Sequence, residues 1–198
     1  MSADVPTPEF KPKKSVALSG VIAGNTAICT VGHTGNDLHY RGYDIADIAN
    51  HATYEEVACL LIHGHLPNAA GLAAYREKLK KLRGLPVPLR AVLEQIPATA
   101  HPMDVLRTGC SMLGHLEQEK LPSAGAGAAS APGARDLADR LLACFPSMLL
   151  YWHHFARHGK RIMTDTADDS VAGHFLHLLH QRAPSTSHVR ALDRSLIL

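Results

Sequence analysis

The stretch HYRGYDIADIANHATYEEVACLLIHGHLP, from His39 to Pro67, decides the fold. Thr53 and Glu56 have the S/T-x-x-E spacing of a capping box, in which the hydroxyl accepts a helix amide proton and the carboxylate reaches back to the start of the helix. Gly64 and the proline that closes the stretch give a usual C-terminal stop. The sequence therefore predicts a short, well-bounded helix. Its apolar residues fall at helical spacing and form one stripe: Tyr54, Val57, Leu60 and Leu61.

A turn and a shorter helix come before it. Arg41 and Gly42 combine a cation with a flexible turn, and Asp44 is a carboxylate of the kind that begins helices. Arg41 and Asp44 have two explanations at this point: they are functional residues, or they form a helix cap or a buried ion pair. With either explanation, the stretch predicts a pair of helices on which further helices can pack.

Strands are expected near the N-terminus and almost nowhere else. The segment Val16–Val31 contains two β-leaning runs separated by Gly24-Asn25, which is a hairpin turn signal. Residues 1–14 contain three prolines and lack the apolar run of a signal peptide. We therefore expect a flexible arm followed by a small hairpin.

The chain after Tyr43 has helical periodicity, which predicts one all-α domain over residues 15–198 with the small hairpin at its start. A segment rich in small residues, at about 118–134, is expected to be a flexible loop within that domain. Pro146 is expected to bend the long helix that follows. Five large side chains of that helix are candidates for burial: Leu141, Leu142, Phe145, Leu149 and Trp152. The predicted helices are 68–82, 86–96, 102–116, 135–158, 172–181 and one that begins at 184.

Composition places the chain among soluble globular proteins. Its 198 residues are 46% hydrophobic and 19% charged, enough for one sizeable core. No apolar run approaches the ~20 residues of a membrane-spanning helix, and the net charge of +2 requires no polyanionic partner. The four cysteines include no C-x-x-C pair and are expected to be reduced. We therefore expect a cytoplasmic protein that binds neither membranes nor nucleic acids.

Motifs for metal, nucleotide or nucleophile chemistry are weak. His174, His177 and His180 are spaced three residues apart, which spreads them over ~120° of a helix, so one ion could take two of them but hardly three. His153 and His154 are expected to point to different faces. The sequence contains no G-x-S-x-G, G-x-G-x-x-G or P-loop motif. We expect neither a metal site nor a bound cofactor.

Several segments together resemble the citrate synthase family. YRGYDI and EEVACLLIHGHLP, both within the opening stretch, are similar to the N-terminal region of that family. KPKKSVALSGVIAGNTAICTVG (11–32), AHPMDVLRTGCSMLG (100–114) and GHFLHLLH (173–180) are similar to one branch of it, the 2-methylcitrate synthases. The resemblance covers roughly residues 11–198 with the motifs in order. It implies a helical fold that forms part of the family's large domain.

The resemblance also implies a reaction, the condensation of an acyl-CoA with oxaloacetate. This chemistry needs a carboxylate base, hydrogen bonds to the thioester enolate and cations for the oxaloacetate carboxylates. In the family the catalytic histidines and aspartate follow the region matched here, so we expect no catalytic residue before Leu198. The implied substrates are oxaloacetate and propionyl-CoA, with acetyl-CoA as the alternative, and the implied assembly is a homodimer.

A basic cluster ends the helix predicted over 68–82. Lys78, Lys80 and Lys81 lie in its last turns, where cations suit the helix dipole. A solvated helix end explains them; the alternative is contact with an anion such as a carboxylate or a coenzyme A phosphate. We take these three lysines as the candidate substrate-binding residues. His101, at the start of the helix predicted over 102–116, is expected to make a structural hydrogen bond.

The last predicted helix ends on apolar residues. Val189, Leu192, Leu196 and Ile197 form a stripe, and no Gly, Asn or Pro closes the helix before Leu198. We therefore expect the N-terminal part of a longer enzyme, inactive alone, with Val189, Leu192 and Leu196 exposed. The alternative is a self-contained, non-catalytic helical module with a dimerising or regulatory role, which would cover its own apolar faces.

Overall fold

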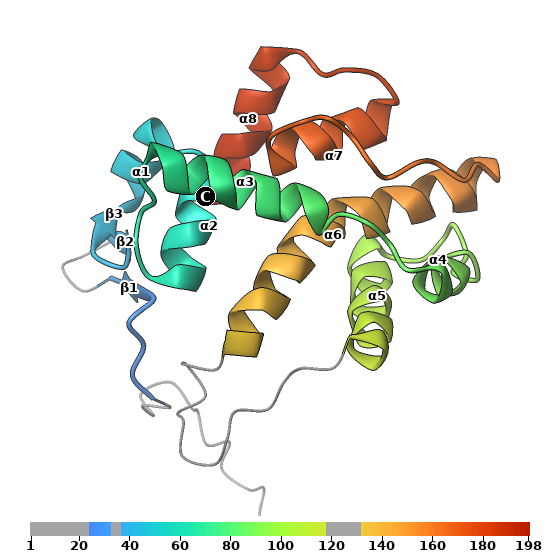
Figure 1. Cartoon of the computed structure of the whole chain (residues 1–198), viewed down its shortest axis with the longest axis horizontal. Coiled ribbons are helices and arrows are strands. Elements are labelled where there is room, and N and C mark those ends of the chain that lie inside the picture. Colours follow the sequence, from blue (N-terminus) through green and yellow to red (C-terminus); the bar gives the residue numbers. More distant parts are fainter. Residues whose placement is uncertain (1–23, 33–36, 118–131) are drawn as a thin grey trace, which may run out of the picture.

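The residues that the structure describes form eight helices and a small sheet (Figure 1). This computed structural model describes residues 24–32, 37–117 and 132–198. The predicted arm, the first run of the predicted hairpin and residues 118–131 of the predicted loop lie outside them. The all-α prediction is confirmed. The elements are β1 (Cys29–Val31), β2 (Leu38–Tyr40), β3 (Tyr43–Asp44), α1 (Ile45–His51), α2 (Tyr54–His63), α3 (Ala69–Lys81), α4 (Val87–Leu93), α5 (Pro102–Leu116), α6 (Pro132–His158), α7 (Val171–His180) and α8 (Thr186–Ile197).

The sheet is antiparallel, in the order β1, β2, β3. Cys29 pairs with Tyr40, so β1 has a described partner, β2, that the sequence did not predict as a strand. Arg41 and Gly42 form the tight turn between β2 and β3, and both have positive φ angles, 48° and 91°. Glycine adopts this conformation without a steric penalty, which explains why the turn contains one.

The helix ends follow the predicted capping. The Asp44 carboxylate accepts the amide proton two residues further along, at 2.8 Å, and thereby begins α1. The Glu56 carboxylate accepts from both the amide and the hydroxyl of Thr53, each at 2.8 Å. Arg41 donates to the Leu61 carbonyl in the last turn of α2, at 2.9 Å. Of the two explanations left open for Arg41 and Asp44, the structure therefore supports helix-end hydrogen bonds.

The long helix α6 forms the centre of the molecule. It packs against α4, α5 and α7, and it changes direction in its middle, where Pro146 lies (Figure 1). Met148, Tyr151 and Trp152 are at most 3% exposed and belong to the main core. None of the described helices combines the length and the hydropathy that a membrane span needs. Four side chains predicted to be buried are only half-buried, because they line a hollow on the surface: Leu141, Leu142, Phe145 and Leu149.

The start of α7 is held by two buried charged side chains. Glu55 of α2 is 0% exposed and accepts the amide proton of Val171, the first residue of α7, at 2.8 Å. Arg83, which follows α3 and is 1% exposed, donates to the carbonyls of Asp168 and Ser170 at 2.7 and 3.2 Å. A carboxylate at a helix N-terminus also interacts favourably with the helix dipole. These contacts join segments that are far apart in the chain.

Close packing of α5 on α6 gives a first prediction. A Cβ at Gly109 would lie 2.8 Å from Sδ of Met148, which is fully buried. Gly109→Ala should therefore lower the free energy of unfolding by about 1 kcal/mol, because overpacking outweighs the gain in helix propensity. Gly114 in the same helix has nothing within 4 Å of that position, so Gly114→Ala should raise it by about 0.5–1 kcal/mol. Urea unfolding measures the free energy of unfolding of both variants. An equal increase in the two would contradict the close contact between Gly109 and Met148.

A second prediction tests the buried guanidinium. Arg83→Met keeps most of the side-chain volume but leaves the carbonyls of Asp168 and Ser170 without their donor. We expect a loss of about 3 kcal/mol or more in the free energy of unfolding, which is typical of breaking a buried charged contact. Arg182→Met, at an exposed position, is the control and should change stability by less than about 0.5 kcal/mol. Two similar urea midpoints would show that Arg83 is dispensable.

Candidate functional site

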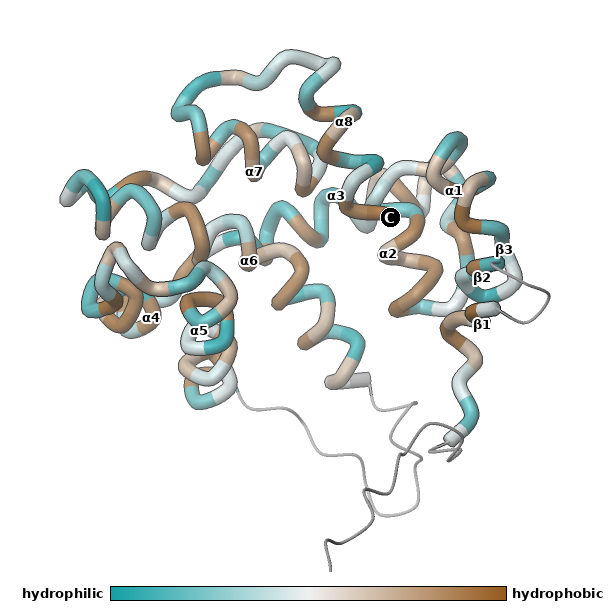
Figure 2. Tube along the Cα trace, turned by 180° about the vertical axis from the view of Figure 1, so that it is seen from behind, coloured by the Kyte–Doolittle hydropathy of each residue, from teal (hydrophilic) through white to brown (hydrophobic). Residues whose placement is uncertain are grey.

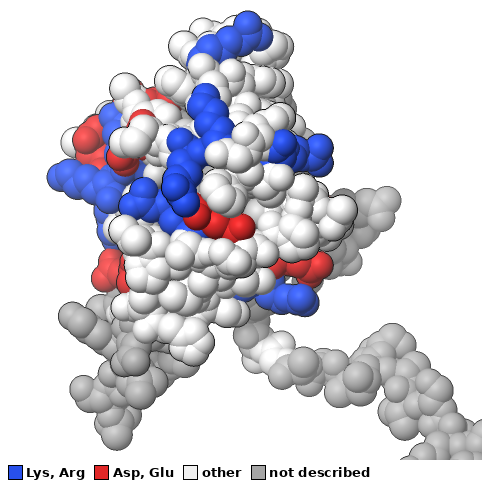
Figure 3. Space-filling view, turned by 90° about the vertical axis from the view of Figure 1, so that its right-hand side faces the viewer, with Lys and Arg blue, Asp and Glu red and all other residues white. Residues whose placement is uncertain are grey.

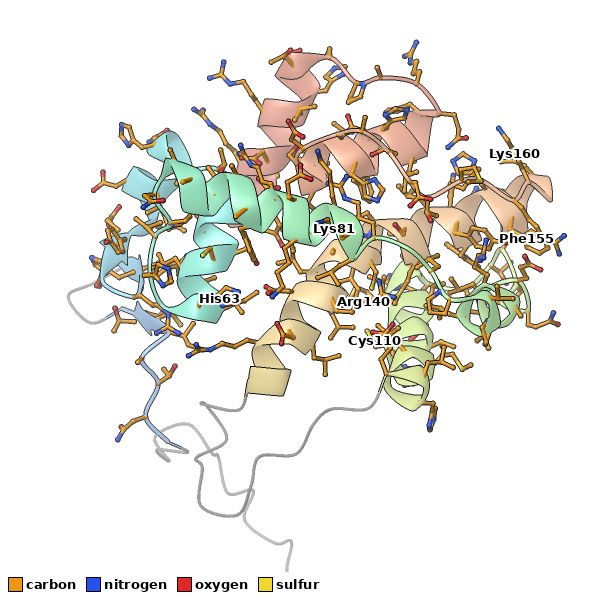
Figure 4. The ribbon with its side chains drawn as sticks, in the orientation of Figure 1. His63, Lys81, Cys110, Arg140, Phe155 and Lys160 are labelled. Carbon is orange, nitrogen blue, oxygen red and sulfur yellow. The ribbon has the colours of Figure 1, made fainter. Side chains whose placement is uncertain are left out.

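The three candidate lysines have different environments. Lys78 Nζ lies 2.7–2.8 Å from two carboxylates of α6, and Lys80 Nζ lies 2.6 Å from the carboxylate of Asp169, just before α7. Lys81, at the C-terminal end of α3 (Figure 4), is exposed and makes no hydrogen bond or ion pair with another described residue. The structure therefore does not gather the three ammonium groups at one point. Their contact with an anion stays a prediction.

One of the carboxylates at Lys78 is the centre of a buried cluster between α2, α3 and α6. Asp139 is 0% exposed and accepts from the Tyr75 hydroxyl and from Lys78 Nζ, both at 2.7 Å. His63 Nε2 lies 3.1 Å from the same carboxylate, and His63 is on α2 (Figure 4). Burial and the hydrogen bond to Asp139 raise the pKa of Tyr75, so the Tyr75 hydroxyl stays protonated and donates. The cluster stabilises the helix packing.

Sequence reasoning missed this cluster. His63, Tyr75 and Lys78 lie 61 to 76 residues before Asp139, so no local motif connects them. No local signal marked Asp139 either, because the charged residues Arg135, Asp136 and Arg140 surround it in the sequence and make it resemble part of a solvated helix face.

A polar pocket of about 480 Å³ lies between α3, α8 and the start of α7. Arg76, Arg190 and Arg194 line it. Arg190 and Arg194 are exposed, and their guanidinium groups make no hydrogen bond or ion pair within the described part of the chain. Three carboxylates, those of Asp168, Asp169 and Asp193, also line the pocket. The Asp193 carboxylate accepts from the Tyr54 amide at 3.2 Å, and burial raises its pKa. Because guanidinium groups match carboxylates and phosphates, the pocket can hold an anion.

A second basic surface covers the side of the molecule with α4 and the C-terminal end of α6. Lysine and arginine side chains outnumber acidic ones in this view (Figure 3). Arg161 donates two hydrogen bonds to the Glu94 carboxylate, at 2.7 and 2.8 Å, and lies over the Phe155 ring. These hydrogen bonds lower the pKa of Glu94 to about 2. Arg161 therefore ties the end of α6 to α4, which is a structural role.

The histidines have structural hydrogen bonds. His101 Nδ1 accepts from the Met103 amide at 3.2 Å and caps α5, which confirms the structural hydrogen bond expected for His101. His177 Nδ1 lies 2.8 Å from the Asp168 carboxylate. His153 and His154, expected to point to different faces, have ring centroids only 5.4 Å apart. Among the described residues, no group of three His, Cys, Asp or Glu side chains is placed to hold a metal ion.

His174 is the most deeply buried histidine of the described residues, at 0% exposure. Its Nε2 lies 3.0 Å from the Ser147 hydroxyl and its Nδ1 lies 3.0 Å from the Thr166 hydroxyl. A neutral ring can donate from one nitrogen and accept at the other, so two hydroxyls satisfy it fully. Burial, with the nearby Arg83 guanidinium, lowers the pKa of His174 to about 3.

The buried ring predicts a pH dependence of stability. The pKa of His174 is lower in the folded chain than in the unfolded chain, so below pH ~6.5 the unfolded chain binds the extra proton and unfolding is favoured. This contribution is absent above pH ~6.5 and should reach about 1.4 kcal/mol per pH unit as the pH falls toward 3. Urea unfolding at pH 7.5, 6.5 and 5.5 measures it. His174→Asn should remove this contribution, so the free energy of unfolding of the variant should fall less steeply below pH ~6.5. An unchanged pH dependence would show that His174 is not its source.

Comparison with known proteins identifies the family to which the chain is similar. The family model described as citrate synthase, C-terminal domain, matches residues 17–198. The chain is 54% identical to 2-methylcitrate synthase of Shewanella oneidensis, over 96% of this chain and 48% of that protein. It is 35% identical to citrate synthase of Acidithiobacillus ferridurans, again over 96% and 48%.

A solved structure, citrate synthase of Pyrobaculum aerophilum, has a TM-score of 0.77 and 28% identity, and the match covers 91% of this chain and 45% of that one. The chain thus spans about half the length of the curated relatives it matches. The family model covers nearly the whole chain. The chain therefore belongs to the citrate synthase family.

Proposed function

We propose that this chain supplies the N-terminal half of an enzyme that condenses propionyl-CoA with oxaloacetate and water to give 2-methylcitrate and coenzyme A. One observation supports the choice of acyl chain: identity is 54% to the 2-methylcitrate synthase of S. oneidensis, against 35% to a citrate synthase and 32–34% to the 2-methylcitrate synthases of Corynebacterium glutamicum and Mycobacterium tuberculosis. The order of its motifs resembles the N-terminal half of such enzymes. Acetyl-CoA, the substrate of a plain citrate synthase, is the alternative.

The proposed division of labour follows from what the described residues offer. His174 is buried and held neutral by two hydroxyls, and Asp139 is occupied by three donors. Neither group is free to abstract a proton α to a thioester carbonyl. We propose that the other half of the fold supplies the catalytic groups and that the chain alone is inactive. We place the enzyme in the cytoplasm, in propionate catabolism, as a homodimer.

A thiol-release assay tests this function. The chain alone, with oxaloacetate and propionyl-CoA, should release no free thiol above background. Co-expression with a polypeptide that spans the part of the S. oneidensis relative not matched here should restore release. Propionyl-CoA should give a kcat/KM at least about tenfold above that of acetyl-CoA, since one well-packed methylene changes transition-state binding by 1–3 kcal/mol. Turnover by the chain alone would refute the division of labour, and a preference for acetyl-CoA would select the alternative substrate.

The polar pocket and Lys81 are the proposed anion contacts. Arg190 and Arg194 project from α8 without partners among the described residues, and Lys81 is similarly exposed. The double variant Arg190→Ala, Arg194→Ala should weaken binding of oxaloacetate or coenzyme A by about tenfold or more, because hydrogen bonds to charged groups contribute about 1.5–3 kcal/mol. NMR titration of the chain with each ligand separates the two anions, and Lys81→Ala tests the lysine. Arg157→Ala is a matched control on the other basic surface; equal effects there would mean only general charge attraction.

A further inference from the structure

The polar pocket described above is bordered by segments that lie far apart in the chain. Its wall is formed by the end of α1, the N-terminal cap of α2, the middle of α3, the start of α7 and most of α8. Figure 2 shows hydrophilic positions on both α3 and α8. A molecule bound in the pocket would therefore contact all of these segments at once.

The last of these helices, α8, is only partly anchored in the described part of the chain. Of its predicted apolar stripe, Ile197 is 3% exposed and belongs to a core cluster, whereas Leu196 is 41% exposed. Asp193 accepts the Tyr54 amide proton and so connects α8 to α2. Although α3 and α8 both line the pocket, the described residues form no hydrogen bond or ion pair between them. A bridging molecule would add that connection.

The charges of the pocket wall are unequally paired. Two of its three carboxylates lie within 2.8 Å of basic side chains that do not line the pocket: Asp168 near His177 and Asp169 near Lys80. The guanidinium groups of Arg190 and Arg194 have no partner among the described residues. These arginines lie four residues apart and therefore next to each other on α8, where like charges destabilise a helix. An anion between them would relieve this repulsion.

Arg76 connects the pocket to the start of α7. Its Nη2 donates to Thr53 Oγ1 at 3.3 Å and lies 3.6 Å from Oε2 of Glu55. The other carboxylate oxygen of Glu55 accepts the Val171 amide proton. Because 28% of the Arg76 side chain is exposed and a guanidinium has five N–H donors, this group can also donate to a ligand. Ser170, which caps α7, lines the same pocket.

We infer that a small dicarboxylate bound in the polar pocket bridges α3 and α8 and stabilises the start of α7. The inference rests on the proposed function, which gives the pocket its anion contacts, and it names the class of anion. Two guanidinium groups one helical turn apart suit two separate carboxylates, each held by a bidentate pair of hydrogen bonds. The volume of about 480 Å³ is that of a small-molecule site, and the wall carboxylates disfavour a denser charge such as a phosphate.

Hydrogen–deuterium exchange of the chain with and without saturating succinate, as the dicarboxylate probe, tests the inference. Exchange in α8 and at Val171–Gly173 should slow at least tenfold, because opening of these segments must release the ligand. Exchange in α5, which does not line the pocket, should not change. Arg190→Lys with Arg194→Lys keeps both charges but loses the bidentate fork, so the slowing should fall at least fivefold. Arg182→Lys, at an exposed position outside the pocket wall, is the matched control and should keep it.

Unchanged exchange in α8 of the original chain would overturn the inference, as would equal slowing in α5. Full slowing in the double lysine variant, or an equal effect of inorganic phosphate at the same concentration, would also overturn it, because general charge attraction would then explain the binding. No acyl-CoA is present in this experiment. A failed thiol-release assay therefore counts against the proposed function alone, and the absence of slowing counts against this inference alone.

Discussion

The buried contacts of Glu55 and Arg83 with the start of α7 are the constraint on which the C-terminal part of the structure depends. A carboxylate and a guanidinium at 0% and 1% exposure are costly to desolvate. They persist because each meets backbone polar groups at the start of α7: the amide of Val171 and the carbonyls of Asp168 and Ser170. These contacts fix the position and direction of α7, and α8 follows it.

The position of α7 and α8 decides what the surface offers. On one side of α8, the arginines face a polar pocket beside α3; on the other, its leucines face the apolar hollow beside α6. α6 contributes to both the sealed core and the open hollow, because Leu141, Phe145 and Leu149 pack against the cluster that contains Met148 and also line the hollow. One amphipathic helix therefore separates a surface suited to anions from an apolar surface.

Local signals in the sequence were sufficient for the helices and their caps. The capping box of Thr53 with Glu56 and the helix-starting Asp44 were each predicted from neighbours within four residues, and the structure confirms both. The partners of Glu55, Arg83 and Asp139 lie 61 to 116 residues away, so no local pattern could reveal them. For the same reason, apolar periodicity marked Leu142 and Phe145 as buried without showing that both line a hollow on the surface. The anion role of Lys78, Lys80 and Lys81 stays a prediction, and two of them have carboxylate partners.

Hydrogen–deuterium exchange on Glu55→Ala tests most directly whether the buried Glu55 carboxylate positions α7 and α8. Glu55→Gln is the control, because it keeps an acceptor for the Val171 amide. Glu55→Ala should lose amide protection in α7 and α8 while α4 and α5 keep theirs, since α4 and α5 pack on each other and on α6 and have no contact with Glu55. Glu55→Gln should keep most of the protection. Equal loss in all helices, or unchanged protection in α7, would contradict the claim that this buried carboxylate positions the C-terminal helices.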